Sequence, residues 1–231
     1  MRVQIIGKGR VGYSLYLFLK DRGFDVEIFS RREGGRILED GDILFFAVKD
    51  REIREVAENF SNLNFSVFCH LSGALSSDIL PTKKERASFH PLQAFSRADP
   101  KLWEGITVIA EGTEGALNVL EEFSERLSLK MKKIQKDKKV IYHAAAVMLS
   151  NLIYVPLLGA ERLFSEIGID REDYGKLLRT SVENFLNYGK GGITGPIFRG
   201  DWETVELHKK NLKGIEGEIY TKLSELLVKL L

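Results

Sequence analysis

The sequence predicts an α/β fold in which a doubly wound parallel sheet is followed by an all-helical domain. Three observations support this prediction. Up to about residue 137, short apolar runs alternate with helix-like segments, which is the order that right-handed βαβ units require. After that residue no strand-like run remains, and three long segments have helical patterns. A glycine-rich turn directly follows the first apolar run.

Composition restricts the class of protein. The chain has 231 residues, of which 44% are hydrophobic and 29% charged, and its formal net charge is +1. These values are ordinary for a globular protein, and a charge so close to zero predicts no attraction for nucleic acid or for an anionic membrane. The single cysteine, Cys69, excludes an internal disulfide, and its apolar surroundings indicate a buried, unreactive thiol.

The predicted elements follow in order along the chain. Apolar runs predict strands over 3–6, 26–30, 42–48, 65–70, 106–110 and 129–134, and a run at 88–89 leads into a loop that contains Pro91. Helical patterns cover 13–19, 51–59, 113–127, 138–167, 171–188 and 202–231. The run 42–48 is apolar throughout, as expected of a parallel strand covered on both faces.

The turn after the first run contains Gly7, Gly9 and Gly12 in the spacing Gly-x-Gly-x-x-Gly, between a strand and a helix. Such a turn aims free backbone N–H groups and a helix N-terminus at a pyrophosphate. Gly7 makes the tight turn, Gly9 lets the backbone approach the phosphates, and Gly12 lets the helix pack on the strand. The predicted cofactor-binding turn of this Rossmann fold also includes Lys8, Arg10 and Val11.

The end of the second strand predicts which cofactor binds. An acidic residue there would hold the ribose 2′-hydroxyl of NAD, but the chain has Ser30, Arg31 and Arg32. Hydroxyl and guanidinium donors suit a 2′-phosphate, so we expect NADP rather than NAD; a solvated basic turn is the alternative. After the third strand, Ala47 and Val48 are expected to pass beneath the adenosine ribose and the diphosphate.

The ends of the later strands are the expected place of the chemistry, because ligands bind at the carboxyl edge of such sheets. Ser72 and Gly73 follow the fourth strand and are expected to border the nicotinamide. His90 is predicted to donate or accept the proton in a hydride transfer, with Pro91 fixing its loop. Capping of a backbone carbonyl by His90 is the alternative. His70 is predicted to be a core histidine.

A second set of polar residues lies on the first helix after residue 137. His143, Val147 and Asn151 are spaced four residues apart and so share one helix face. Their neighbours are apolar, so a buried imidazole or amide there needs partners. Catalysis and hydrogen bonding between helices are both open explanations. Pro156 predicts a kink one turn after Asn151.

The glycine-rich loop 191–201 carries a third set. Thr194, Arg199 and Asp201 are its side chains with polar reach. An arginine can hold a substrate carboxylate or phosphate with two hydrogen bonds; an Arg199–Asp201 pair, with Asp201 capping the next helix, is the structural alternative. Gln93 joins Thr194 and Arg199 as a predicted substrate-binding residue. The lysines between 130 and 139 are expected to form a solvated face.

These motifs together resemble the Rossmann-like and DUF2520 domain proteins, over nearly the whole chain. The matching segments are the glycine turn, 70–73, 88–93, 142–145 with Asn151, and 194–201. The resemblance implies membership of the 6-phosphogluconate dehydrogenase-like superfamily, with pyrroline-5-carboxylate reductase and prephenate dehydrogenase as relatives. It further implies an N-terminal NADP or NAD domain, a helical domain that often forms a dimer interface, and a substrate bound between the two.

Two residues match motifs of those relatives. His90 with Pro91 is similar to the segment that carries the catalytic histidine of prephenate dehydrogenases. Asn151 is similar to the helix asparagine of β-hydroxyacid dehydrogenases, although the lysine expected one turn earlier is Val147, and His143 is its candidate substitute. The predicted catalytic residues are therefore His90, His143 and Asn151.

The sequence thus predicts an NADP-binding Rossmann domain, 1–137, and a helical substrate and dimerisation domain, 138–231. The predicted activity is hydride transfer between NADP(H) and a small anionic carbonyl or imine compound, without a metal. A prephenate or arogenate dehydrogenase-like enzyme and a non-catalytic nicotinamide sensor are the alternatives.

The apolar segment 141–164 predicts a homodimer, because so wide an apolar surface is rarely left in water. The chain starts on a predicted core strand, and its longest apolar stretch, 144–160, is expected to be too short to span a bilayer comfortably. A cytoplasmic location is therefore expected.

Overall fold

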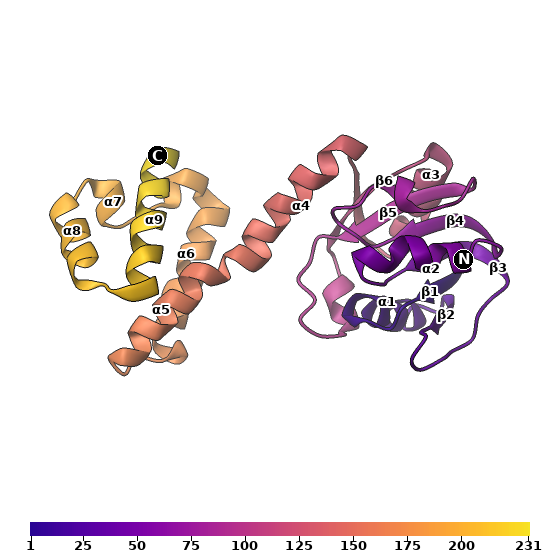
Figure 1. The fold of residues 1–231 in the computed structure, drawn as a ribbon, viewed down its shortest axis with the longest axis horizontal. Helices are drawn as coiled ribbons and strands as arrows, with labels where there is room; N and C mark the ends of the chain where they lie inside the picture. The colour runs from indigo at the N-terminus through magenta and orange to yellow at the C-terminus, as the bar shows by residue number, and fades with distance from the viewer. The chain divides into compact units, whose positions relative to one another are not determined.

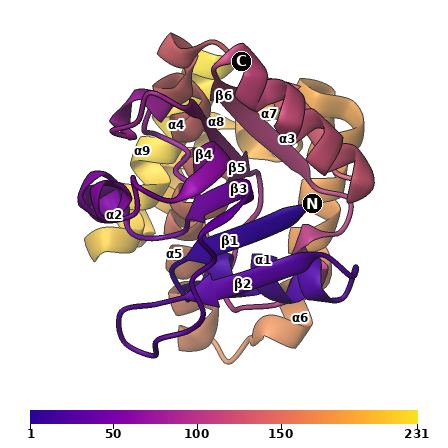
Figure 2. The ribbon, with the colours of Figure 1, turned by 90° about the vertical axis from the view of Figure 1, so that its right-hand side faces the viewer.

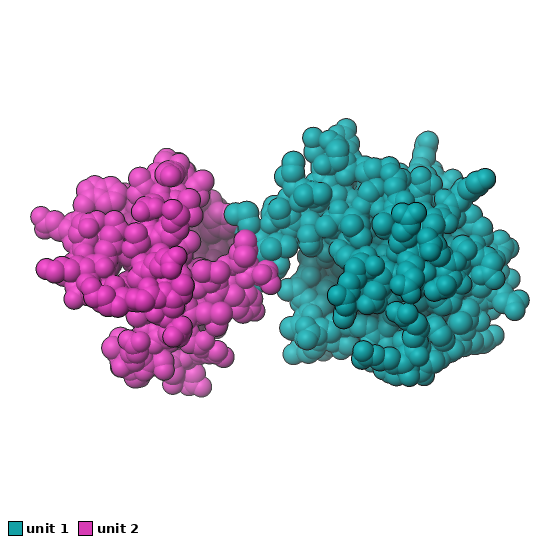
Figure 3. Space-filling model, viewed as in Figure 1, with its two compact units in different colours: residues 1–150 teal, residues 151–231 magenta.

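The computed structural model describes all residues, 1–231, as two compact units. Unit 1 comprises Met1–Ser150 and unit 2 comprises Asn151–Leu231, as coloured in Figure 3. Unit 1 is built on one seven-stranded sheet, and unit 2 is helical. The prediction of a doubly wound α/β fold followed by a helical part is confirmed.

The sheet of unit 1 has the order β2-β1-β3-β4-β5-β6-β7 (Figures 1 and 2). Its strands are β1 (Arg2–Ile6), β2 (Asp25–Phe29), β3 (Asp40–Phe46), β4 (Asn64–His70), β5 (Glu85–Pro91), β6 (Thr107–Gly112) and β7 (Lys130–Lys133). Strands β1 to β5 are parallel, β6 is antiparallel to β5, and β7 is parallel to β6. The strand order changes direction between β1 and β3, and ligands of such sheets bind at the carboxyl ends beside this point.

Helices cover both faces of the sheet, as Figure 2 shows. The elements are α1 (Arg10–Lys20), η1 (Asp50–Glu52), α2 (Ile53–Asn59), η2 (Ser77–Ile79), η3 (Pro100–Trp103), α3 (Glu114–Arg126), η4 (Lys136–Lys138) and α4 (Lys139–Val147). On one face Phe18 of α1 and Phe123 of α3 pack with Phe45 and Trp103 in an apolar core. On the other face, α2 packs Val56 against the sheet in a second core. Both faces are therefore covered, as the apolar strands require.

His90 and Pro91 lie within β5 and not in the predicted loop. They stand opposite Ile109 and Val108 in the antiparallel pair with β6. Pro91 is the last residue of the strand, a position where a missing N–H removes no bond from the interior of the ladder. The strand, and not a proline-fixed loop, holds His90 in place.

Unit 2 is a bundle of short and medium helices. Its elements are α5 (Tyr154–Glu166), α6 (Arg171–Tyr188), η6 (Gly189–Gly192), α7 (Pro196–Arg199), α8 (Trp202–Asn211) and α9 (Gly214–Leu230). The single helix predicted over 202–231 is two helices, with the break at Leu212 and Lys213. The predicted glycine-rich loop contains one helical turn, α7, which ends at Gly200 in the left-handed conformation (φ 72°).

Unit 2 has a very small core. Val205 is its only buried hydrophobic residue. Contacts between its helices are made at a few points: a Cβ on Gly159 of α5 would lie 3.3 Å from Ile219 of α9, and Arg162 pairs with Glu216 at 3.0 Å. The apolar side chains of α5 and α6 are consequently left exposed in the single chain.

One helical run, Lys136–Glu166, contributes to both units. It includes a π-helical segment, η5 (Met148–Leu152), just before Pro156. Since proline has no N–H to donate to the carbonyl four residues earlier, the predicted disturbance takes the form of this π-helical turn. By length and composition the run could cross a membrane: its best window has a mean hydropathy of 1.6 and no buried residue. The expectation that this stretch is too short is therefore wrong.

The two compact units divide at residues 150 and 151, whereas the composition shift in the sequence lies at 137 and 138. The difference is α4, which carries no strand pattern but packs with the sheet. Side chains from its first two turns reach β5 and the turn after β4. Contacts across the sheet edge, and not composition, decide where unit 1 ends.

Candidate functional site

Two of the three glycines in the turn between β1 and α1 are tightly packed, and the third, Gly9, has free space around it. Gly7 has a φ of 118°, and a Cβ on it would lie 2.8 Å from the carbonyl carbon of Ala47. A Cβ on Gly12 would lie 2.7 Å from the Cβ of Ala47, so α1 packs tightly on the end of β3. Around Gly9, the nearest atom to such a Cβ is 4.0 Å away. Helix α1 begins there without a side-chain cap, so its first N–H groups remain available for an anion.

A pocket of about 430 Å³ opens beside this turn at the carboxyl ends of β1, β2 and β3. It is lined by Ile6, Gly7, Lys8, Gly9, Ser30, Arg31, Arg32, Glu33, Ala47, Val48, Lys49, Glu52, Val56, Asn59 and Phe60. Three residues of the predicted cofactor turn lie outside the lining: Gly12 is buried, Arg10 is exposed, and Val11 packs against the core. The pocket thus combines most of the predicted nucleotide-binding residues.

The cations of this pocket are partly paired with carboxylates. Arg31 lies 3.7 Å from both Glu52 and Glu55, and Lys8 lies 3.1 Å from Glu33. Arg32 has no ion pair. Exposed pairs of this kind contribute little free energy, so an anionic ligand can displace the carboxylates. The donors fit the phosphates of a dinucleotide, with Arg32 available for a 2′-phosphate.

The hydroxyl of Ser30 is used by the protein itself. Its oxygen accepts a hydrogen bond from the backbone N–H of Glu33 at 3.2 Å, and its backbone pairs with Gly34 in an isolated bridge. Ser30 therefore shapes the turn that carries Arg31 and Arg32.

Ser72 is almost fully buried, and its hydroxyl is satisfied inside the turn after β4. It donates to Asp50 at 2.8 Å and accepts from the N–H groups of Ala74 and Leu75 at 3.2 and 3.0 Å. Of the two residues expected to border the nicotinamide, Ser72 thus holds the turn, whereas Gly73 is buried beneath two histidines.

His70 is a buried histidine with both ring nitrogens paired. Its Nδ1 accepts from the N–H of Ser72 at 3.1 Å, and its Nε2 donates to the carbonyl of Ser76 at 3.2 Å. Burial lowers the pKa of His70 to about 3, so the ring is neutral. The interpretation of His70 as a core histidine is confirmed. Cys69 beside it is also buried, and burial raises the pKa of its thiol well above the usual value, as expected of an unreactive cysteine.

His90 and His143 come together over Gly73. A Cβ on Gly73 would lie 2.9 Å from Nε2 of His90 and 3.0 Å from Cε1 of His143, so only glycine fits beneath the two rings. The rings are perpendicular, with centroids 5.5 Å apart. The Nδ1 atom of His90 lies 2.6 Å from the hydroxyl of Tyr142, whereas the buried Nδ1 of His143 has no partner. Burial, with the charges of His143 and Lys139, lowers the pKa of His90 to about 4.

Lys139 is a functional candidate that the sequence analysis missed. It is 2% exposed, so the prediction that all lysines between 130 and 139 are solvated is wrong for this residue. Its Nζ donates to the carbonyl of Ser72 at 3.0 Å and to the hydroxyl of Ser88, and lies 3.8 Å from the buried carboxylate of Glu111. Glu111 also accepts from the N–H and the hydroxyl of Ser77, at 2.6 and 3.0 Å.

One face of α4 therefore meets one face of β5. Lys139, Tyr142 and His143 stand at positions i, i+3 and i+4 of the helix, and Ser88 and His90 are two residues apart on the strand. The helical spacing was present in the sequence and is the signal that could have identified Lys139 and Tyr142. Glu111 gave no such signal, because its position opposite Ser88 depends on the antiparallel pairing of β6.

The remaining predicted residues lie elsewhere. Asn151 is exposed in η5, where the wider π-helical turn breaks the regular four-residue spacing from His143. Gln93 is exposed, and its side-chain oxygen accepts from the N–H of Ala94 at 2.8 Å. Thr194 and Arg199 are exposed in unit 2. Their roles in catalysis and substrate binding stay predictions.

The alternative for Arg199, an ion pair with Asp201, is absent from the structure. Asp201 instead caps α8, accepting from the N–H and the hydroxyl of Thr204 at 3.2 and 2.8 Å. The capping half of that interpretation is confirmed. No group of histidine, cysteine and carboxylate side chains is arranged to hold a metal ion.

Comparisons with known proteins agree with this description. Residues 106–227 match the sequence profile of a domain of unknown function, DUF2520. Protein TM1727 of Thermotoga maritima is 25% identical and superposes with a TM-score of 0.77 over 98% of this chain and 97% of its own. A search of curated proteins found no match.

Two more distant structures share the fold. A proposed NADP oxidoreductase of Bacteroides fragilis, BF3122, has a TM-score of 0.84 at 18% identity, over 99% of this chain and 98% of its own. The pyrroline carboxylate reductase of Plasmodium falciparum, solved with NADP bound, has a TM-score of 0.64 at 12% identity, over 99% of each chain. At these identities the similarity concerns the fold, which includes both the sheet and the helical part.

Proposed function

The chain belongs to the DUF2520 family, and from this premise we propose that it is an NADP-dependent oxidoreductase that reduces a small, anionic carbonyl or imine compound. One observation carries the proposal: an open glycine turn and an arginine-bearing pocket lie on the same sheet edge as two histidines that meet over a glycine. The related folds include a proposed NADP oxidoreductase and an NADP-bound reductase, which supports the same cofactor class.

Different residues of the pocket would bind different parts of the cofactor. The open backbone at Gly9 and the start of α1 would bind the diphosphate, and Arg32, with Arg31 released from its carboxylates, would bind the 2′-phosphate. Val48 and Phe60 line the pocket and supply apolar surface for the adenosine. When bound, the reduced nicotinamide supplies a hydride.

The histidine pair would supply the proton chemistry. His90 is neutral near pH 7, and its Nε2 lies over Gly73, the residue expected to border the nicotinamide. The unpartnered Nδ1 of His143 is a polar atom that a substrate can satisfy. Substrate groups of negative charge would be held by further residues, for which Gln93, Thr194 and Arg199 are the proposed candidates and Asn151 a proposed helper.

Titration of the purified protein with NADPH and NADH, followed by nicotinamide fluorescence, tests this proposal. Tight binding of NADPH with weak binding of NADH is the expected result, and Arg32→Ala should remove most of the difference. A panel of anionic ketones and imines then identifies the substrate. Absence of binding of either cofactor would overturn the proposal. Oxidation of an aromatic acid would indicate a prephenate dehydrogenase-like activity, and cofactor-dependent assembly without turnover would indicate a sensor.

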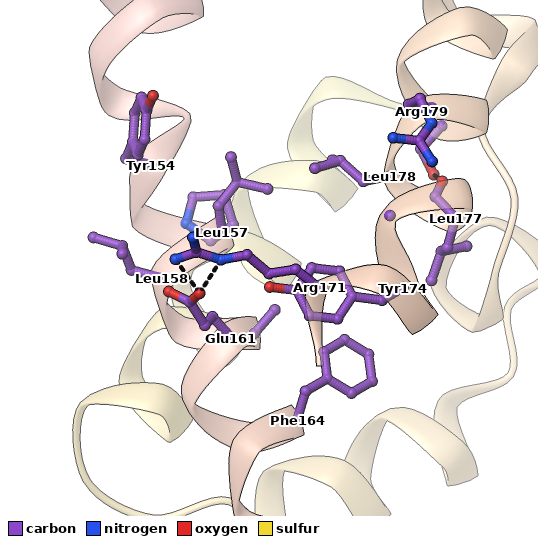
Figure 4. Close-up of a pocket in the computed structure, with 14 residues that line it drawn as sticks. Tyr154, Leu157, Leu158, Glu161, Phe164, Arg171, Tyr174, Leu177, Leu178 and Arg179 are labelled. Atoms are coloured by element: carbon purple, nitrogen blue, oxygen red, sulfur yellow. Dashed lines mark hydrogen bonds and ion pairs between the residues drawn. The ribbon is translucent and has the colours of Figure 1, made fainter. Parts of the chain in front are cut away.

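We further propose that the protein is a homodimer held together by unit 2. With Val205 as its only buried hydrophobic residue, unit 2 lacks a core that could stabilise it alone. A groove of about 560 Å³ between α5 and α6 is lined mainly by apolar side chains, and Figure 4 shows Leu157, Leu158, Leu177 and Leu178 around it. A second copy of the chain supplies apolar surface of the same kind.

A membrane span is the competing explanation for the apolar surface of the helical run Lys136–Glu166. The ion pair of Lys136 with Asp78 and the burial of Lys139 tie its first turns to unit 1, and Glu161, Arg162 and Glu166 lie in its last turns. Such flanking charges also occur at membrane spans, but α6 exposes Leu177 and Phe185 between charged residues that a membrane interior would not accommodate, so we favour an interface between copies in the cytoplasm. A dimer that stays in solution without detergent, measured by light scattering, is the expected result.

A further inference from the structure

The hydrogen bond between Tyr142 and His90 links the tyrosine hydroxyl to the protonation of the histidine ring. The tyrosine hydroxyl lies 2.6 Å from Nδ1 of His90, and the rings meet edge to face with centroids 5.6 Å apart. No other protein group is bonded to this hydroxyl. A neutral imidazole has one donor nitrogen and one acceptor nitrogen, so a hydroxyl that donates to Nδ1 places the ring proton on Nε2.

We propose that Tyr142 is a positioning residue for His90: its hydroxyl donates to Nδ1, fixes the proton of the neutral ring on Nε2, and so makes the site a proton donor suited to reduction. This inference rests on the proposed oxidoreductase function. It goes beyond that function by assigning the direction of the proton transfer and the atom that makes it.

The protonation states of both partners agree with this assignment. Burial raises the pKa of Tyr142 to about 12, so the phenol keeps its proton and has one to donate. The lowered pKa of His90 keeps its ring neutral near pH 7. The titratable and charged groups that face His90 are Tyr142, His143 and Lys139 from α4 and His70 from β4. None of them is a carboxylate, and the buried carboxylate of Glu111 on β6 is paired with Lys139 and not with His90.

The step balances as a carbonyl reduction. As the hydride adds to the carbonyl carbon, the π electron pair moves to the oxygen, and that oxygen takes the proton from Nε2 of His90. The N–H bond breaks, its electron pair stays in the ring, and the proton of Tyr142 passes to Nδ1. The resting state returns when Nε2 takes a proton from water and the proton on Nδ1 passes back to the half-buried phenolate. A neutral histidine can act in this way because the developing alkoxide is a stronger base than the phenolate of Tyr142, the group that ends the step without its proton.

The ¹⁵N resonances of the imidazole rings test the assignment without substrate or cofactor. The chain has only four histidines, His70, His90, His143 and His208, so each can be assigned by one substitution. Near pH 7 we expect Nε2 of His90 to have the shift of a protonated nitrogen and Nδ1 that of a bare one. In Tyr142→Phe we expect both resonances to move toward the average of the two tautomers.

The chain offers a matched control. His208 and Tyr220 of unit 2 form the same pair at 2.7 Å, also edge to face, far from the sheet in sequence. Tyr220→Phe should change the His208 resonances and leave those of His90 unchanged. Unchanged resonances of the buried His70 would show that the Tyr142→Phe variant is folded. If the variant does not fold, the tautomer of His90 in the wild type still decides the question.

Two outcomes overturn the inference: a proton on Nδ1 of His90 in the wild type, or no change at His90 in Tyr142→Phe. Failure of the proposed function is a separate result, because it is read from NADPH titration. Once a substrate is known, Tyr142→Phe should lower kcat with KM unchanged, and by less than the roughly 10²–10⁴-fold loss expected for His90→Asn.

Discussion

Gly7, Gly9 and Gly12 share a residue type but differ in what a side chain would meet. Gly7 and Gly12 are needed by the fold, since added Cβ atoms would approach Ala47 closely. Gly9 has free space around it, so the packing does not require its lack of a side chain. The packing roles that the motif predicts for Gly7 and Gly12 agree with the structure, whereas the role of Gly9 toward the phosphates stays a prediction.

This difference gives a prediction for two alanine variants. Gly9→Ala should leave the melting temperature nearly unchanged and weaken NADPH binding, because the new methyl group occupies the space of the phosphates. Gly12→Ala should lower the melting temperature, because α1 must move away from β3. Thermal melts and NADPH titrations of both variants measure the contrast. Equal loss of stability in the two would contradict it.

His70 and His90 predict that unit 1 loses stability in acid. Their pKa values are lowered to about 3 and about 4 in the folded chain, below the usual 6.5. Between these values the unfolded chain binds protons that the folded chain does not, so stability is full above about pH 6.5 and is lost as the pH falls. Each ring contributes up to about 1.4 kcal/mol per pH unit in this window.

Urea unfolding at several pH values between about 7 and 5 measures this effect. His90→Asn should reduce the dependence on pH, since one of the two groups is removed. His208→Gln, at an exposed histidine of unit 2, is the control variant. Identical stability at both ends of the window would show that the buried rings do not resist protonation.

At the scale of elements, α4 illustrates what the sequence could and could not predict. Residue spacing in the sequence predicted that this segment is helical and that His143 shares a face with residues of neighbouring turns. Its attachment to the sheet was not, because Lys139 sits in a lysine-rich segment that is otherwise exposed. Lys139 is buried beside the carboxylate of Glu111 on β6, and only the tertiary structure brings these two residues together. The same limit applies to His90, whose strand extends because β6 pairs with it in the antiparallel sense.

The Lys139–Glu111 pair predicts a large difference between two neighbouring lysines. Lys139→Met should lower the free energy of unfolding by about 3–5 kcal/mol, because it leaves a buried carboxylate without its cation. Lys138→Met, one residue earlier and exposed, should change it little. Combining Lys139→Met with Glu111→Gln should recover part of the loss. Urea unfolding of the four proteins measures this, and equal effects at positions 138 and 139 would contradict it.

At the scale of the whole molecule, the two units differ in how they are stabilised. Unit 1 buries nearly all of the chain's apolar core, whereas unit 2 buries one such residue and exposes many. On α5 and α6 these exposed residues include Leu158, Leu177 and Phe185. Burial of apolar area is the main stabilising contribution to a fold, so unit 2 must obtain it from another surface. The apolar composition of segment 141–164 was visible in the sequence, but the shortage of a core was not.

Charge placed in the α5–α6 groove should therefore separate the proposed dimer. Leu158→Glu and Leu177→Glu each put a carboxylate on the apolar lining, and burying an unpaired carboxylate in an interface costs several kcal/mol. Light scattering of the wild type should give twice the mass of one chain, and both variants should shift toward one. Ile37→Glu, an equally simple change at an exposed apolar residue of unit 1, should leave the dimer intact. In the proposed dimer unit 2 would obtain apolar contacts from the partner, so the two variants should also melt at a lower temperature, and the melting temperature of the wild type should rise with protein concentration. A monomeric wild type with a concentration-independent melting temperature would refute this account of unit 2.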